Sequence, residues 1–135
     1  MRGCRLSACL SLMALLAIGC GGGTKLPELG TVTGVVTVNG KPVEGLTVTF
    51  EPKGSRPSTG VTDSEGHYSL LFNKNTAGAV VGSHTVRISQ EVSAEIPEKD
   101  QVRIPRSYNT ASTLKRDVKA GKNTFDFKIV TKRTR

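Results

Sequence analysis

Few side chains in this sequence could perform acid–base or nucleophilic chemistry. His67 and His84 are its two histidines, and histidine is the most frequent general base near neutral pH. We expect His84 to pack inside the protein or to make a hydrogen bond at its rim, and His67 to face solvent beside a turn. No serine lies in the setting of a nucleophile elbow. The sequence therefore predicts no catalytic residues and a protein that is not an enzyme.

Asp63 and Glu65 are the strongest candidates for metal binding, because calcium prefers carboxylate oxygens. Their loop lacks the further oxygen donors that a calcium site requires. It is instead typical of a tight turn, in which Asp63 bonds the nearby backbone and Gly66 takes the left-handed conformation. Elsewhere, no group of histidines and carboxylates has the spacing of a metal site. We expect neither a metal nor another cofactor.

Cys20 has the most specific predicted chemistry. Two arginines precede an apolar run from Leu6 to Ile18, and Gly19 and Cys20 follow it. This order resembles a bacterial lipoprotein signal peptide, in which residues 1–19 are removed and the Cys20 thiol takes a diacylglyceryl group. A further fatty acid, such as palmitate, can then acylate the new amino terminus. The apolar run is shorter than the roughly 20 residues of a spanning helix. The alternative is an ordinary secretory signal that is cleaved near Gly19.

The predicted anchor places the protein in the cell envelope, bound to membrane lipid through acylated Cys20. Residues 20–30 are glycine-rich at their start and are typical of a flexible linker. Gly21 occupies the position where an aspartate often signals retention in the inner membrane, so we expect the outer membrane. Cys4 and Cys9 lie in the part that is removed, which leaves no cysteine for a disulfide. The facing leaflet and the oligomeric state stay open.

Positive charge is concentrated near the C-terminus. The formal net charge of the whole chain is +8, and residues 99–135 carry eleven Lys and Arg against three Asp and Glu. Such a segment could contact anionic lipid, an acidic polysaccharide or an acidic envelope protein; the alternative is a solubilising surface with a basic tail at residues 131–135. Nucleic acid is not expected as a partner, since no aromatic residues interleave with the basic ones. The candidate partner-binding residues are Lys115, Arg116, Lys119 and Lys122.

Short strands dominate the chain after residue 30. Leu46, Val48 and Phe50 alternate with polar residues, which places alternate side chains on one face of a sheet. His84, Val86 and Ile88 are expected to point inward in the same way. The predicted strands cover residues 31–38, 46–51, 59–62, 67–72, 82–89, 112–119 and 124–130. About seven strands separated by turns predict an all-β fold, a transthyretin-like or immunoglobulin-like β-sandwich in outline.

The segments between these strands are predicted from their turn residues. Asn39-Gly40 predicts a tight hairpin turn, because both residues tolerate a positive φ. Residues 120–123 predict a second turn, and residues 73–81 a loop. Residues 91–109 form a polar connection that is unusually long for a compact domain, and we therefore expect it to be either functional or mobile.

Four segments of the sandwich form a recognisable set. They are Gly34-Val35-Val36-Thr37-Val38-Asn39-Gly40-Lys41-Pro42-Val43, Val48-Thr49-Phe50-Glu51-Pro52, Thr62-Asp63-Ser64-Glu65-Gly66-His67-Tyr68-Ser69-Leu70 and Gly82-Ser83-His84-Thr85-Val86-Arg87-Ile88. Together they resemble the carboxypeptidase regulatory-like domains, and residues 104–127 resemble the closing segment of short bacterial lipoproteins built on that domain. The resemblance covers about residues 31–130. It implies a transthyretin-like (prealbumin-like) β-sandwich that serves as an accessory or binding module.

We therefore expect a non-catalytic, lipid-anchored β-sandwich of the envelope that acts as an interaction or structural module. Its expected contact surfaces are the connection at residues 91–109 and the basic stretch at residues 115–122. The alternative is a carbohydrate-binding module, although the absence of tryptophan disfavours stacking on sugars. A hydrolase is less expected, because the enzyme branch of the transthyretin-like group needs a Tyr-Arg-Gly-Ser ending, whereas this chain ends Thr131-Lys132-Arg133-Thr134-Arg135.

Overall fold

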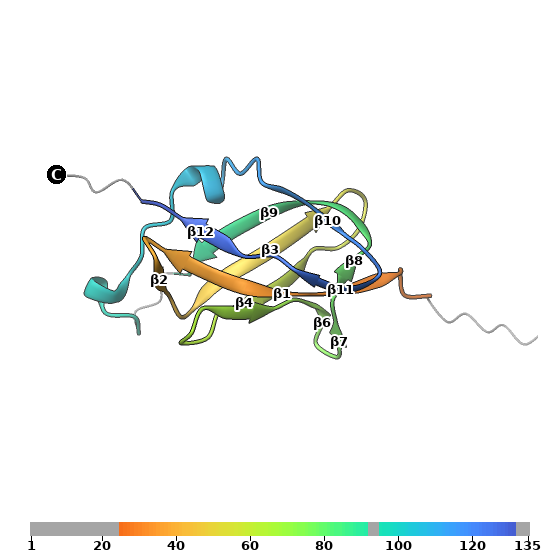
Figure 1. Ribbon diagram of the computed structural model, residues 1–135, viewed down its shortest axis with the longest axis horizontal. Coiled ribbons are helices and arrows are strands. Elements are labelled where there is room, and N and C mark those ends of the chain that lie inside the picture. Colours follow the sequence, from red (N-terminus) through yellow and green to blue (C-terminus); the bar gives the residue numbers. More distant parts are fainter. Residues whose placement is uncertain (1–24, 92–94, 132–135) are drawn as a thin grey trace, which may run out of the picture.

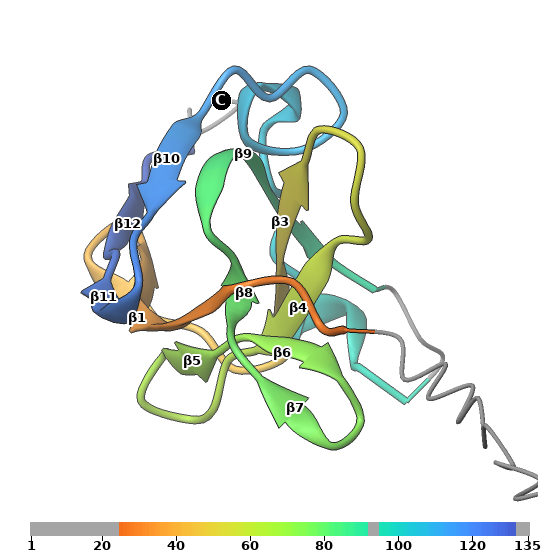
Figure 2. The same ribbon diagram turned by 90° about the vertical axis from the view of Figure 1, so that its right-hand side faces the viewer.

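The computed structural model describes residues 25–91 and 95–131, which form a sandwich of two β-sheets (Figure 1, Figure 2). The prediction of an all-β sandwich is confirmed: each sheet has six strands, and the only helical segments in the described ranges are short 3₁₀ turns. The predicted signal peptide at residues 1–19, the start of the linker at 20–30 and most of the tail at 131–135 lie outside the described residues.

Both sheets are built from short strands around one or two long ones. The first sheet contains β1 (Leu29–Val38), β2 (Lys41–Pro42), β5 (His67–Ser69), β8 (Ala79–Val80), β11 (Gly121–Thr124) and β12 (Phe127–Ile129). The second contains β3 (Leu46–Pro52), β4 (Ser58–Val61), β6 (Leu71–Asn73), β7 (Thr76–Ala77), β9 (Gly82–Gln90) and β10 (Lys115–Val118). The 3₁₀ turns are η1 (Glu98–Asp100) and η2 (Arg106–Tyr108).

Strand β1 is the centre of the first sheet and runs along the long axis of the molecule (Figure 1). On one side it pairs antiparallel with β8, β5 and β2 in succession. On the other side it pairs parallel with β11 and then β12. Because these parallel partners come from the end of the chain, the first sheet is complete only when the C-terminal strands have docked.

The core lies between the sheets and follows the predicted alternation. Leu46, Val48 and Phe50 from β3 are fully buried, as are Val86 and Ile88 from β9. The other buried core residues are Val32, Val36, Val38, Tyr68, Ala79, Val118, Phe127 and Ile129, together with Leu70 between β5 and β6. Full burial of each such aliphatic or aromatic side chain stabilises a fold by about 1.5–3 kcal/mol. The alternation of apolar and polar residues along the sequence therefore identified most of the core.

Two predicted turns are confirmed by their backbone conformations. Asn39 and Gly40 both have positive φ, 52° and 81°, as a tight hairpin turn between β1 and β2 requires. In the second turn, the Asp63 carboxylate accepts the backbone N–H groups of Glu65 and His67, each at 2.9 Å. Gly66 follows with a φ of 78°. Asp63 therefore organises a turn, as its sequence context predicts.

The step between β11 and β12 falls at Phe125 and Asp126 and is held by three hydrogen bonds. The backbone N–H of Phe125 donates to the Thr33 carbonyl at 2.9 Å. One residue on, the Asp126 carboxylate replaces a strand carbonyl by accepting the Val35 N–H at 2.9 Å. The Tyr68 hydroxyl donates to the Phe125 carbonyl at 2.6 Å. This "β11–β12 step" keeps both parallel strands in register with β1.

Several strand boundaries differ from the prediction because they depend on long-range pairing. The predicted turn at residues 120–123 is wrong: most of it belongs to β11, which pairs parallel with the first half of β1. The Asn123 side chain supports this by donating to the carbonyls of Thr31 and Lys119. The predicted strand at 67–72 divides at Leu70, where the chain passes from the first sheet (β5) to the second (β6). The predicted strand at 112–119 is shortened to β10.

The predicted loop at residues 73–81 contains two short strands. β7 pairs with β6, and β8 pairs with the first two residues of β1, Leu29 with Val80 and Gly30 with Ala79. Ala79 is fully buried. The apolar residues of this segment thus cover the end of the sandwich at which the described chain begins.

The long connection after β9 is docked on the sandwich at several points. Arg87 in β9 donates to the carbonyls of Asn109 and Thr110 and forms an ion pair with Glu51 at 2.9 Å. Val102 donates its backbone N–H to the Gln90 side chain at 2.6 Å. Partly buried side chains of the connection, Val102, Ile104 and Tyr108, pack against the core. Residues 101–110 therefore close one end of the sandwich instead of extending into solvent.

Candidate functional site

His84 is buried in β9, as predicted, with its ring centroid 5.7 Å from that of Phe50. Its Nε2 lies 2.5 Å from the Val80 carbonyl oxygen, and because a carbonyl only accepts, Nε2 donates a hydrogen bond there. Nδ1 is also buried and has no hydrogen-bond partner among the described residues. His84 thus joins β9 to β8 from inside the core, and the core encloses both ring nitrogens.

His67 lies on the surface, as predicted. Its side chain is 57% exposed, and Nε2 is 3.7 Å from a carboxylate oxygen of Glu65, which is 78% exposed. An ion pair this open to water contributes little to stability. His67 and Glu65 therefore flank the Asp63 turn without forming an enclosed acid–base pair.

Metal-ligating side chains do not gather in the described part of the chain. Within residues 25–91 and 95–131, no three His, Cys, Asp or Glu side chains are grouped so that they could hold a metal ion. The helical segments of these ranges are all too short and too polar to cross a membrane. Cys20, the predicted lipidation site, lies outside the described residues.

The four candidate partner-binding residues, which we call the basic edge, lie on one side of the sandwich. Lys115 and Arg116 are in β10, Lys119 follows it, and Lys122 is in β11. Figure 2 shows β10 and β11 on the same side, at the margins of the two sheets. The three lysines are exposed. Lysine on an edge strand also prevents another strand from adding to the sheet, so a role in partner binding stays a prediction.

Arg116 differs from the three lysines because it points between the sheets. Its guanidinium carbon lies 5.1 Å from the ring centroid of Phe127, a core residue of the opposite sheet. One of its nitrogens donates to the Lys115 carbonyl at 2.7 Å. A cation over an aromatic face is attracted by the partial negative charge on that face of the ring. Arg116 thus covers the core at the open side of the sandwich.

A pocket of about 600 Å³ opens on the outer face of the first sheet beside the β11–β12 step. Its walls include Val61, Asp63, His67, Tyr68 and Asp126. Both carboxylates already accept backbone hydrogen bonds: Asp63 holds its turn, and Asp126 holds the β11–β12 step against β1. The Tyr68 hydroxyl is likewise bonded to the backbone. The polar groups of this pocket mainly support the fold.

The stability of the β11–β12 step depends on pH through the Tyr68 hydroxyl. Burial raises the pKa of the Tyr68 hydroxyl well above its usual value, and the Asp126 carboxylate adds to the rise, while Arg116 opposes it. A raised pKa means that the folded protein holds the proton at a pH where the unfolded chain has lost it. The stabilisation is therefore complete below about pH 10, the pKa of an unperturbed tyrosine, and is lost as the pH rises above it.

We predict that Tyr68→Phe lowers the free energy of unfolding by about 1–2 kcal/mol at neutral pH, through loss of the hydrogen bond to Phe125. Above about pH 10 the wild-type protein should lose stability more steeply than the variant. Urea unfolding at a series of pH values measures both effects. Tyr108→Phe is the matched control, because Tyr108 packs only partly against the core. Parallel pH profiles for wild type and Tyr68→Phe would show that Tyr68 does not titrate differently in the two states.

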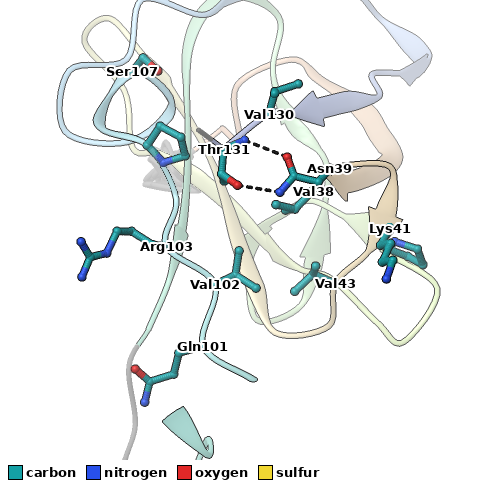
Figure 3. A pocket seen from close by; sticks show the side chains of 12 residues that line it. Val38, Asn39, Lys41, Val43, Gln101, Val102, Arg103, Ser107, Val130 and Thr131 are labelled. Atoms are coloured by element: carbon teal, nitrogen blue, oxygen red, sulfur yellow. Dashed lines mark hydrogen bonds between the residues drawn. The ribbon is translucent and has the colours of Figure 1, made fainter. Parts of the chain in front are cut away.

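A groove with a volume of about 1250 Å³ opens at the end of the sandwich (Figure 3). We call it the end groove. Its walls come from the β1–β2 hairpin, the connection and the residues after β12. They comprise Val38, Asn39, Lys41, Pro42, Val43, Gln101, Val102, Arg103, Pro105, Ser107, Val130 and Thr131. These walls combine aliphatic side chains with two cations and several uncharged polar groups.

Asn39 fixes one wall of the end groove. Its side chain donates to the Thr131 hydroxyl at 2.6 Å and accepts the Thr131 N–H at 3.0 Å (Figure 3). Its backbone N–H donates to the Ile129 carbonyl at 2.8 Å. The residue that makes the hairpin turn thereby also holds the chain after β12 against it.

The sequence pointed to only part of this groove. The connection at 91–109 was expected to be a contact surface, and it supplies Gln101, Val102 and Arg103. Lys41 had no functional signal, because it follows a strong turn motif and is separated from Arg103 by 62 positions. Only the docking of the connection brings them to one groove.

No protein-family model matches the chain, and no curated protein matches it.

Proposed function

We propose that this protein is a non-catalytic, lipid-anchored β-sandwich that serves as an interaction or structural module of the cell envelope. The carboxypeptidase regulatory-like character of its motifs supports an accessory domain, and the signal-like sequence before Cys20 supports the anchor. Under this proposal the partners are membrane lipid at Cys20 and an envelope protein or polysaccharide at the far side of the domain.

One observation supports the proposal above the others. The start of the described chain and the end groove lie at opposite ends of the long axis of the molecule. Figure 1 shows the chain entering β1 at one end, while the β2 hairpin, the connection and the end of β12 meet at the other. β1 has 10 residues, which span about 30 Å in an extended strand. A lipid at Cys20 would therefore attach, through the linker, to the end of the domain opposite the end groove.

Photo-cross-linking in intact cells tests this proposal. A photo-reactive amino acid is placed at Ser107 in the end groove, at Lys122 on the basic edge, or at Thr59, an exposed residue of β4 used as a control. We expect a discrete adduct from Ser107 and none from Thr59. Equal adducts from all three positions would contradict a defined contact surface.

The alternative, a carbohydrate-binding module, predicts a different result in the same experiment. Recovery of cell-wall glycan in place of a protein adduct at Ser107 would favour it. Aromatic rings that could stack on a sugar do not line the end groove. Phe50, Phe127 and Tyr68 instead pack on one another in the core. For this reason we place the protein-interaction role first.

A further inference from the structure

The end groove has a consistent charge. Lys41 and Arg103 lie on opposite sides of it, with Val43 and Val102 between them (Figure 3). Its described lining residues include no aspartate or glutamate. The nearest acids along the chain, Asp100 and Glu44, are exposed and lie outside the lining. A ligand in the groove therefore meets two cations and no opposing carboxylate on the walls.

The floor of the groove is aliphatic. Val38, Val43 and Val102 supply methyl groups there, and Val130 is 69% exposed at its margin. Methyl groups offer no hydrogen bonds to sugar hydroxyls, but they do favour burial of aliphatic side chains. The groove thus suits a chain that alternates apolar and acidic groups.

One wall offers an unpaired backbone. Gln101, with φ −75° and ψ 126°, and Pro105, with φ −58° and ψ 145°, give this segment an extended backbone at both of its ends. Among the described residues, no hydrogen bond involves the backbone of Arg103 or Ile104. An extended segment with unpaired backbone groups can pair with a peptide in the manner of an edge strand. Pro105, which has no N–H, limits such pairing to a short stretch.

We propose that the end groove binds an extended acidic peptide segment of a partner protein. In this complex the peptide backbone lies along residues 102–104, its aliphatic side chains contact Val43 and Val102, and its carboxylates face Lys41 and Arg103. This inference rests on the proposed function, because it names the chemistry of the partner at the end that faces away from the anchor.

The test uses the full lipidated protein in detergent and fluorescence anisotropy of labelled peptides. The probe is a short peptide of alternating glutamate and valine, and the control peptide has lysine in place of glutamate. The groove variant is Lys41→Glu with Arg103→Glu. The matched variant is Lys119→Glu with Lys122→Glu, which makes the same change in net charge on the basic edge. Circular dichroism checks that both variants are folded.

We expect the acidic peptide, but not the basic one, to bind wild type, and its affinity to fall at about 0.5 M NaCl because salt screens exposed charges. The groove variant should bind about tenfold more weakly or worse, since two attractive contacts become repulsive. The affinity of the basic-edge variant for the acidic peptide should stay within about twofold of that of wild type, because its changed charges are distant from the groove and are screened by salt.

Three results would overturn the inference. Equal losses in both variants would mean non-specific attraction to net charge. A loss in the basic-edge variant alone would assign the site to that edge. Tighter binding of oligogalacturonate, an acidic sugar polymer, than of the acidic peptide would assign the groove to polysaccharide. Failure of the acidic peptide to bind wild type would also overturn the inference. It would leave the anchored-module proposal standing, because the cross-linking at Ser107 and the effect of Cys20→Ser on membrane association are measured separately.

Discussion

Gly34→Ala is expected to lower the free energy of unfolding by about 3–5 kcal/mol, a large part of the 5–15 kcal/mol that holds a typical domain folded. A Cβ at this position would lie 1.8 Å from the carbonyl oxygen of Phe125 and 2.9 Å from a ring carbon of Tyr68. Neither neighbour can move freely, because the Phe125 carbonyl accepts the Tyr68 hydroxyl and its N–H donates to Thr33. The added methyl group would separate β1 from the β11–β12 step.

Gly45→Ala is the matched control for this prediction. Gly45 has a φ of 80°, but a Cβ there would meet nothing within 4 Å. Its substitution should therefore cost only the backbone strain, about 1–2 kcal/mol. Urea unfolding followed by circular dichroism compares the two variants. If Gly34→Ala is no less stable than Gly45→Ala, the close approach of Phe125 to β1 does not exist in solution.

The residues typical of turns and the alternation of apolar and polar residues in the strands were sufficient to predict the sandwich and most of its core. The turns at Asn39-Gly40 and at Asp63 form between residues that are close in the sequence, so the sequence beside them contains the signal for each turn. The parallel pairing of β11 has no such signal, because its partner residues in β1 are about 90 positions away. In addition, the glycine and asparagine within residues 120–123 are typical of a turn. Parallel strands are joined by long connections, and local pattern does not reveal their register.

The candidate site was predicted less completely for the same reason. Arg116 was grouped with three exposed lysines on charge alone, although Leu114 and Val118 show that alternate positions of this segment point inward. That alternation was a usable signal for its contact with Phe127. The end groove had no comparable signal, because three segments far apart in the chain form it. Its two cations become a pair only after the connection has docked on β9 through Arg87 and Gln90.

The signal-like sequence before Cys20 leads to the largest expected effect in cells. Cys20→Ser should move the protein from the membrane fraction to the soluble fraction and abolish incorporation of labelled palmitate. Each buried methylene of an acyl chain contributes about 0.8 kcal/mol, so two or three chains attach a protein almost irreversibly. Lysine and arginine near an anionic membrane contribute only about 1 kcal/mol each, and salt screens them. The basic edge alone should therefore give weak, salt-sensitive binding.

Cys9→Ser is the matched control, because Cys9 lies inside the apolar run that is predicted to be removed. It should keep both the label and the membrane association, and a high-salt wash should not release it. The same wash should release whatever fraction of Cys20→Ser remains on membranes. If Cys20→Ser stays membrane-bound through the wash, residues 6–18 rather than acyl chains hold the protein. Both kinds of anchor precede β1 in the chain, so the end groove would still lie at the end of the domain opposite the point of attachment (Figure 1).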